Sequence, residues 1–121
     1  MEKTKKEITK GNKKIEVVFY SGTEAIDVDL DGVKDEVEKH RNYTIITVTD
    51  ETDKVILKGE YNLNISGKFH PDTRAEIEKI IAILKNENKN YQAYLVRQDK
   101  KQKTIEKYYA DKNKIEKMMA E

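Results

Sequence analysis

At 121 residues the chain has the length of one small domain, and 39% of its residues are charged. It contains no cysteine, which excludes disulfides, thiolate metal ligands and a cysteine nucleophile. No apolar run approaches the roughly 20 residues of a membrane-spanning helix, and the N-terminal sequence lacks the apolar segment of a signal peptide. We therefore expect a cytoplasmic protein without a membrane segment.

Charge is segregated along the chain, although the net charge is only +1. Residues 1–14 carry six lysines and two glutamates, whereas residues 15–70 carry six basic and twelve acidic side chains. Residues 97–117 are basic again, with eight basic and four acidic side chains. Two basic ends thus flank an acidic middle, and such a distribution can steer a charged partner even when the total charge is near zero.

The first half of the sequence favours strands. Residues 1–13 are polar and include Gly11, so we expect a loose basic N-terminal arm. β-branched and aromatic residues, or strict alternation of apolar and polar residues, predict strands over 15–21, 24–31, 43–50 and 54–66. Gly59 indicates a bulge in the last of these. Residues 33–41 leave a short helix and a loop both open. The simplest arrangement is an antiparallel meander of four strands.

The second half of the sequence changes to helical periodicity. Apolar residues recur at i, i+3, i+4 and i+7 in PDTRAEIEKIIAILKN, which predicts an amphipathic helix over 71–86. Thr73 and Glu76 have the spacing of a capping box at its start. The segment YQAYLVRQ predicts a fifth strand over 91–98. Residues 103–120 then favour a C-terminal helix.

These elements predict an α+β fold, in which an antiparallel sheet of four to five strands carries one packed amphipathic helix and a C-terminal helix. After the loose arm of residues 1–13, residues 14–121 would form a single domain. The core should contain apolar side chains from the strands and the helices: Val17, Phe19, Ile26, Val28, Leu30, Ile45, Val48, Ile56, Leu63, Ile77, Ile80, Ile81, Leu84 and Leu95.

The stretch DVDLDGVKDEVE, residues 27–38, matches the pattern of a calcium-binding loop. The acidic residues at its ligand places are Asp27, Asp29, Asp31 and Glu38. However, the sequence before it is typical of a strand and not of the helix that should enter such a loop. Val28 and Leu30 also require a core face, which a compact metal loop would not give them. A calcium-binding domain is therefore an alternative, and we expect no metal or other cofactor.

The same stretch can instead form a strand with an acidic face, followed by an Asp-Gly turn. Alternate residues along a strand lie roughly 6.6–6.8 Å apart, similar to successive phosphates of a nucleic-acid strand. A row of carboxylates could therefore occupy a groove lined by Lys and Arg, although it could also be a solvated face that keeps the sheet soluble. The candidate partner-binding residues are Glu24, Asp27, Asp29, Asp31, Asp35, Glu36 and Glu38.

The predicted C-terminal helix offers two further possibilities. Its lysines, together with the basic N-terminus, give the alternative of a nucleic-acid-binding protein, but acidic residues interrupt the basic face. Its apolar residues have a heptad-like spacing and could pair with a second copy, giving a homodimer, or enter a partner groove. These residues are Ile105, Tyr108, Tyr109, Ile115 and Met119.

No catalytic cluster stands out in the sequence. His40 and His70 are isolated, Ser21 and Ser66 each precede a turn glycine, and no glycine-rich phosphate loop exists. We therefore expect no enzyme. The favoured function is a non-catalytic protein-binding module, an inhibitor or adaptor that engages a basic, nucleic-acid-handling partner through an acidic strand face. Anti-defence proteins of mobile elements are one such group, by analogy of type only.

Overall fold

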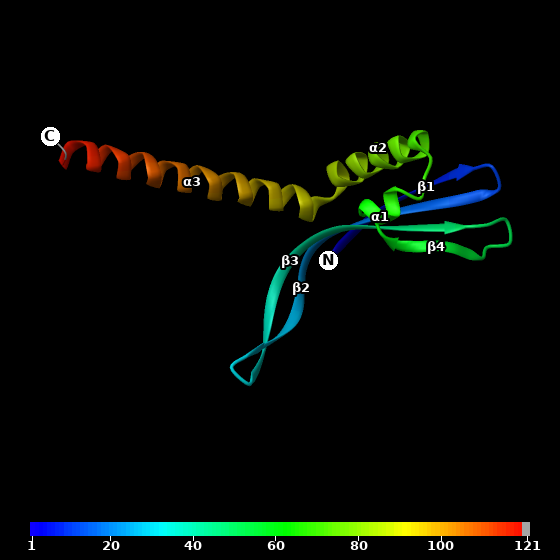
Figure 1. Cartoon of the computed structure of the whole chain (residues 1–121), viewed down its shortest axis with the longest axis horizontal. Coiled ribbons are helices and arrows are strands. Elements are labelled where there is room, and N and C mark those ends of the chain that lie inside the picture. The colour runs from blue at the N-terminus through cyan, green and yellow to red at the C-terminus, as the bar shows by residue number, and fades with distance from the viewer. Residues whose placement is uncertain (120–121) are drawn as a thin grey trace. The chain divides into compact units, whose positions relative to one another are not determined.

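The computed structural model describes the backbone of residues 1–119, while the side chains at positions 30, 109, 111 and 113–119 lie outside the description. The chain divides into two compact units, Met1–Tyr91 and Gln92–Glu121. The first unit holds the sheet and two helices, and the second holds most of a long helix (Figure 1). The single domain expected over 14–121 stays a prediction.

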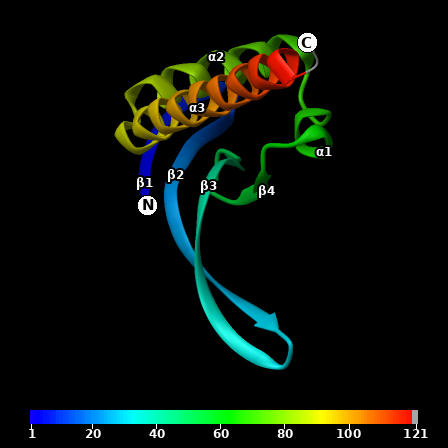
Figure 2. The same cartoon turned by 90° about the vertical axis from the view of Figure 1, so that its left-hand side faces the viewer.

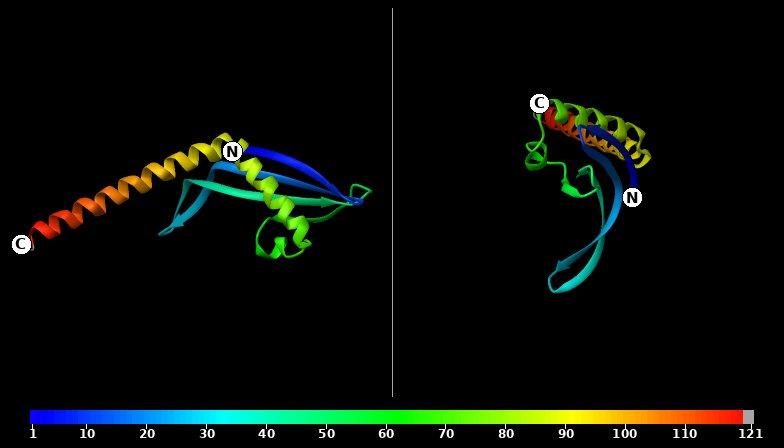
Figure 3. Two further views of the ribbon diagram at one scale, coloured as in Figure 1. Left: turned by 90° about the horizontal axis from the view of Figure 1, so that it is seen from above. Right: turned by 90° about the vertical axis from the view of Figure 1, so that its right-hand side faces the viewer.

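The first unit is an α+β fold. Four antiparallel strands follow one another across the sheet in chain order. They are β1 (Glu2–Lys10), β2 (Lys13–Leu30), β3 (Val33–Thr49) and β4 (Val55–Glu60). Helices α1 (Leu63–Ser66) and α2 (Pro71–Glu87) follow β4, and α2 packs on β1 and β2 (Figures 2 and 3). The sheet and the amphipathic helix predicted from the sequence are confirmed.

The core lies between α2 and one face of the sheet. The pairing register sets Ile15 opposite Val48 and Val17 opposite Ile46, and Phe19 continues the same face of β2. All five side chains are buried. They pack against the apolar stripe of α2 that the sequence predicted: Ile77, Ile80, Ile81 and Leu84. Alternation along β2 and β3 therefore gives the sheet one covered face and one face away from α2.

The expectation of a loose N-terminal arm is wrong, because β1 pairs along its whole length with β2, from Glu2 opposite Ser21 to Lys10 opposite Lys13. The side chain of Thr4 also donates a hydrogen bond to the carbonyl oxygen of Leu84 in α2 at 3.0 Å. β1 is polar because it is an edge strand with little buried surface, so hydrophobic periodicity could not reveal it.

Three segments from β4 onward also differ from the prediction. The strand expected over 54–66 ends at Glu60, because Asn62 caps helix α1 by accepting hydrogen bonds from the backbone N–H groups of Asn64 and Ile65. The expected fifth strand over 91–98 is wrong. It belongs to helix α3 (Lys89–Met119), which also includes the helix expected from 103 onward. The α2 cap differs too, since His70 and not Thr73 caps it.

The predicted core is correct in its centre and wrong at its periphery. Val17, Phe19 and Val48 are buried, as are the four predicted residues of α2. Ile45 is only half-buried, because it faces away from α2. Ile15, Val18 and Ile46 are buried but were missed. The expected core residues that lie exposed or partly exposed are Ile26, Val28, Ile56, Leu63 and Leu95, and the side chain of Leu30 lies outside the described residues.

Asn88, directly after α2, ties the helix to β1. Its side chain is fully buried, donates to the carbonyl oxygen of Glu2 at 3.2 Å and accepts from the backbone N–H of Tyr91 at 3.0 Å. Asn88→Ala should lower the free energy of unfolding by about 1–3 kcal/mol, because both backbone groups lose a buried partner. Urea unfolding measures the change. The exposed Asn86→Ala is the control, and equal stability of the two variants would contradict the role of Asn88.

Candidate partner-binding ribbon

The strands β2 and β3 extend well past their neighbours in the sheet. Pairing of β1 with β2 stops at Ser21, and pairing of β4 with β3 stops at Ile45. Residues 22–41 therefore form a two-stranded ribbon, which curves away from the rest of the sheet (Figures 1 and 2). Both of its edges lack a neighbouring strand within the described part of the chain. Two-stranded hairpins are marginally stable alone, so a partner surface would stabilise this ribbon.

The tip of the ribbon is a two-residue turn at Asp31 and Gly32. Their φ angles are 53° and 80°, the left-handed values that a type I′ turn requires at both central residues. Leu30 and Val33 close the turn as a pair. The turn matches the right-handed twist of the strands that it joins. Residues 33–41 form a strand after it, although the sequence left only helix and loop open.

The register gives the ribbon two faces of different chemistry. Asp27 lies opposite Glu36 and Ala25 opposite Glu38, while Asp29 lies opposite Lys34. We call the four exposed carboxylates on this side the acidic ribbon face: Asp27, Asp29, Glu36 and Glu38. The opposite side is the apolar ribbon face: Ile26, Val28, Val33 and Val37. Three of its side chains are 36–66% exposed, which is unusual for a row of aliphatic residues.

The structure divides the seven candidate acidic residues among four places. Four form the acidic ribbon face, and Asp31 lies in the turn. Asp35 lies opposite Val28, within the apolar side, and accepts the backbone N–H of Glu36 at 2.8 Å. Glu24 lies near the base of the ribbon and forms an ion pair with Arg41. The seven residues therefore do not lie on one face of the ribbon.

The base of the ribbon is braced on the side away from α2. The guanidinium of Arg41 lies 3.1 Å from a carboxylate oxygen of Glu24 and 4.6 Å from the ring centre of Tyr43. The ring of Tyr43 stacks on Tyr20 with centroids 4.9 Å apart. The hydrogen bond and the negative charge of Glu24 raise the pKa of Arg41, so this guanidinium stays charged. These contacts limit bending where the ribbon leaves the sheet.

On the other side of the base, Ser21, His40 and Asn42 form a hydrogen-bonded group. The hydroxyl of Ser21 donates to Oδ1 of Asn42 at 2.7 Å, and Nε2 of His40 lies 2.9 Å from the same oxygen. Nε2 of His40 also lies 3.4 Å from the hydroxyl of Ser21, so the three side chains contact one another. Ser21 is also fully buried. The group therefore connects β2 to β3 at the base of the ribbon.

Gly22 lets other segments approach the base closely. A Cβ atom at this position would lie 2.8 Å from the Cα of Met1 and 3.2 Å from Nδ2 of Asn90, and its φ is 152°. The same Nδ2 donates to the carbonyl oxygen of Ser21 at 3.0 Å. The sequence predicted a turn at Ser21 and Gly22. The structure instead continues β2 through them.

The calcium-loop alternative finds no support in this geometry. Residues 27–30 and 33–38 run along two paired strands, so their carboxylates do not converge from a single loop. Within the described residues, no group of three or more His, Asp or Glu side chains is placed to hold a metal ion. His40 and His70 lie apart, at the ribbon base and at the start of α2.

Helix α3 carries the other candidate residues. Ile105 is 40% exposed and Tyr108 is 63% exposed, while the side chains of Tyr109, Ile115 and Met119 lie outside the described residues. An ion pair between Lys103 and Asp99 shows that acidic residues interrupt its basic surface. Dimerisation through this helix stays a prediction. No helix in the described range is both long and apolar enough to cross a membrane.

The fold and the site define a small α+β protein with a projecting two-stranded ribbon. Comparisons with protein-family models, with curated proteins and with solved structures found no match to this chain. Its function must therefore be inferred from its own residues. Sequence reasoning missed the bracing residues Arg41, Tyr20 and Tyr43. The Asp-Gly turn could have revealed them, because residues equidistant from that turn become partners across the hairpin.

Proposed function

We propose that this protein is a non-catalytic protein-binding module, an inhibitor or adaptor, whose ribbon enters a basic groove of a nucleic-acid-handling protein. The observation that carries the proposal is the acidic ribbon face, with four carboxylates on one side of a ribbon that extends beyond the sheet. Residues 22–41 contain seven acidic and three basic side chains, a net charge of −4. A basic partner is the complementary surface.

The spacing of the carboxylates supports a partner that normally holds nucleic acid. Asp27 and Asp29 follow each other on one strand, and Glu36 and Glu38 on the other. Such neighbours lie roughly 6.6–6.8 Å apart along each strand. Phosphates also form two rows of regularly spaced negative charges on a duplex. A groove that binds phosphates with Lys and Arg could therefore accept the ribbon in their place.

The apolar ribbon face contributes the second part of the contact. Val33 is 66% exposed and Val37 is 42% exposed, so covering them would remove aliphatic surface from water. An electrostatic contact alone gives fast association with little affinity, whereas buried apolar groups slow dissociation. A partner that encloses both faces would hold the ribbon firmly. Such a partner would be encountered in the cytoplasm, where we place the protein.

Capture from a host lysate, with nucleic acid as competitor, tests the proposed class of partner. The immobilised full chain should retain a protein that itself binds nucleic acid, and an excess of a short duplex should release it. Direct binding of the same duplex to the chain is measured in parallel by gel shift. Retained proteins without nucleic-acid affinity would contradict the proposal. A salt-dependent gel shift of the chain alone would instead favour nucleic-acid binding through its basic segments.

A further inference from the structure

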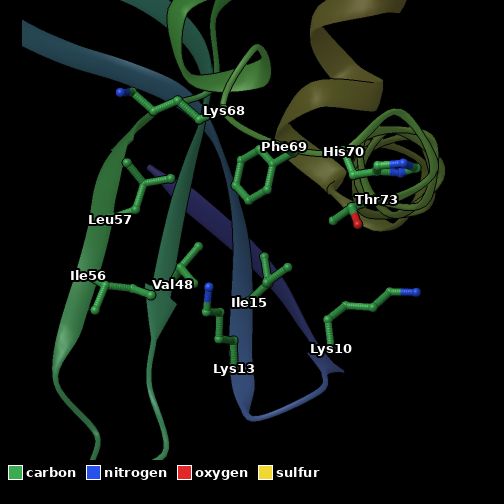
Figure 4. A pocket seen from close by; sticks show the side chains of 10 residues that line it. All are labelled: Lys10, Lys13, Ile15, Val48, Ile56, Leu57, Lys68, Phe69, His70 and Thr73. Atoms are coloured by element: carbon green, nitrogen blue, oxygen red, sulfur yellow. The ribbon is translucent and has the colours of Figure 1, made fainter.

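A small cavity opens at the end of the core, away from the ribbon. It has a volume of about 240 Å³ and lies among the β1–β2 turn, β3, β4 and the segment that enters α2 (Figure 4). Its apolar lining consists of Ile15, Val48, Ile56, Leu57 and Phe69. Pockets for drug-sized ligands measure about 300–1,000 Å³, so an occupant of this cavity must be small.

The polar residues around the cavity are mostly cationic. Lys10 and Lys13 lie on either side of the β1–β2 turn, and Lys68 lies in the segment before α2. In Figure 4 the ammonium of Lys13 points toward the apolar side chains, whereas those of Lys10 and Lys68 extend away from them. Among the described residues that line the cavity, none carries a carboxylate side chain. Lys10 is neutralised by Glu76, whose carboxylate oxygen lies 2.6 Å from its ammonium. Within the described residues, Lys13 and Lys68 have no ion pair that would neutralise them in the same way.

The start of α2 adds to this positive potential. His70 caps the helix by accepting the backbone N–H of Asp72, and Thr73 of the first turn belongs to the cavity lining. A helix N-terminus carries a partial positive charge, which favours a nearby anion, although the carboxylate of Asp72 in the same turn, 3.6 Å from Nδ1 of His70, offsets part of it. The cavity therefore has aliphatic and aromatic side chains at its floor. Around them lie Lys13, Lys68, the N-terminus of α2, and Lys10 in its ion pair with Glu76.

We propose that this cavity binds a small organic monocarboxylate with an apolar body, such as an aryl-alkanoic acid. The apolar body would pack on Ile15, Val48 and Leu57, where it would fill space within the core. The carboxylate would remain at the rim, where Lys13 provides a charge-assisted hydrogen bond and the exposed side chain of Lys68 can turn toward it to provide a second. This site is independent of the proposed function of the ribbon.

Three ligands that share one apolar body test the proposal: 4-phenylbutyrate, 4-phenylbutanol and 4-phenylbutylamine. Each is titrated into the isotope-labelled full chain, and amide chemical shifts are followed by NMR. The carboxylate should shift the amides of Ile15, Val48, Leu57 and Phe69. It should bind at least about tenfold more tightly than the alcohol, and the amine should bind most weakly. Shifts confined to other residues, or equal affinity for the three ligands, would overturn the proposal.

Two lysine variants then test which residues bind the carboxylate. The double variant Lys13→Gln with Lys68→Gln should abolish the preference for the carboxylate over the alcohol, while the alcohol still binds. The matched control is Lys3→Gln with Lys5→Gln, which removes two lysines from the face of β1 that points away from the cavity. All four positions are exposed, so folding should be unaffected. An unchanged preference in the first variant would refute the role of Lys13 and Lys68.

Discussion

Neutralising the acidic ribbon face should weaken capture of the basic partner by about 30- to 1,000-fold. The variant replaces four carboxylates with amides of the same shape: Asp27→Asn, Asp29→Asn, Glu36→Gln and Glu38→Gln. An exposed charge pair with good geometry contributes about 0.5–1 kcal/mol, so four such pairs contribute about 2–4 kcal/mol. Association should slow more than dissociation accelerates, because these charges act mainly on the encounter. Surface plasmon resonance with the identified partner measures both rates.

The matched control removes the same number of negative charges away from the ribbon. It combines four exposed positions on β1, the β3–β4 turn and α2: Glu7→Gln, Glu51→Gln, Asp53→Asn and Glu87→Gln. Capture by this control should stay within about threefold of the unchanged chain, since only distant charges are lost. If both variants lose affinity equally, net charge alone matters and the ribbon has no special role. If neither loses affinity, the acidic ribbon face is only a solvated surface.

Phe19→Ala should lower the free energy of unfolding by about 3–5 kcal/mol, the largest effect expected for a single substitution in this protein. The ring is 1% exposed and meets Tyr91 edge to face with centroids 5.2 Å apart. Removing it would leave a cavity between β2 and α2. Such a loss is a large part of the about 5–15 kcal/mol that stabilises typical domains. Urea unfolding measures it.

Leu63→Ala is the informative control for Phe19. Sequence analysis placed both side chains in the core, but Leu63 is 92% exposed. Its replacement should change the free energy of unfolding by less than about 0.5 kcal/mol. Ile77→Val gives a milder core change, of about 0.5–1.5 kcal/mol, for use if the Phe19 variant does not fold. Equal losses for Leu63 and Phe19 would mean that the core differs from the one described.

Local patterns predicted the segments whose own side chains form the core. Alternation placed Val17 and Phe19 on one face of β2, and helical periodicity placed Ile77 and Leu84 on one face of α2. The prediction failed where polar or mixed sequences had no pattern of their own. It also failed where a strand-like pattern was misleading, because residues 91–98 contain two tyrosines and Val96, which are typical of a strand, yet they form part of α3. How strongly a segment favours a strand depends largely on whether neighbouring strands exist to pair with it. The residue types of this segment therefore did not by themselves decide its structure.

The sequence predicted the acidic residues and the Asp-Gly turn of the candidate site, but not which of the acidic residues lie on one face. Counting along one strand suggested that Asp27, Asp29 and Asp31 belong together. The hairpin register instead joins Asp27 and Asp29 to Glu36 and Glu38. Carboxylates on different strands become neighbours only when backbone hydrogen bonds fix the pairing, and segment 33–41 gave no strand pattern that predicted it.

By itself, then, the sequence determined the α+β class, the helix from Pro71, the centre of the core and the acidic charge of the middle segment. These properties depend on residues close in the chain, whose spacing and charge are fixed by the covalent order. The tertiary structure alone decided that residues 2–10 form an edge strand, that residues 22–41 stand out as a ribbon, and that cationic side chains surround the cavity. Each of these depends on contacts between distant segments, which form only when the whole sheet and α2 assemble.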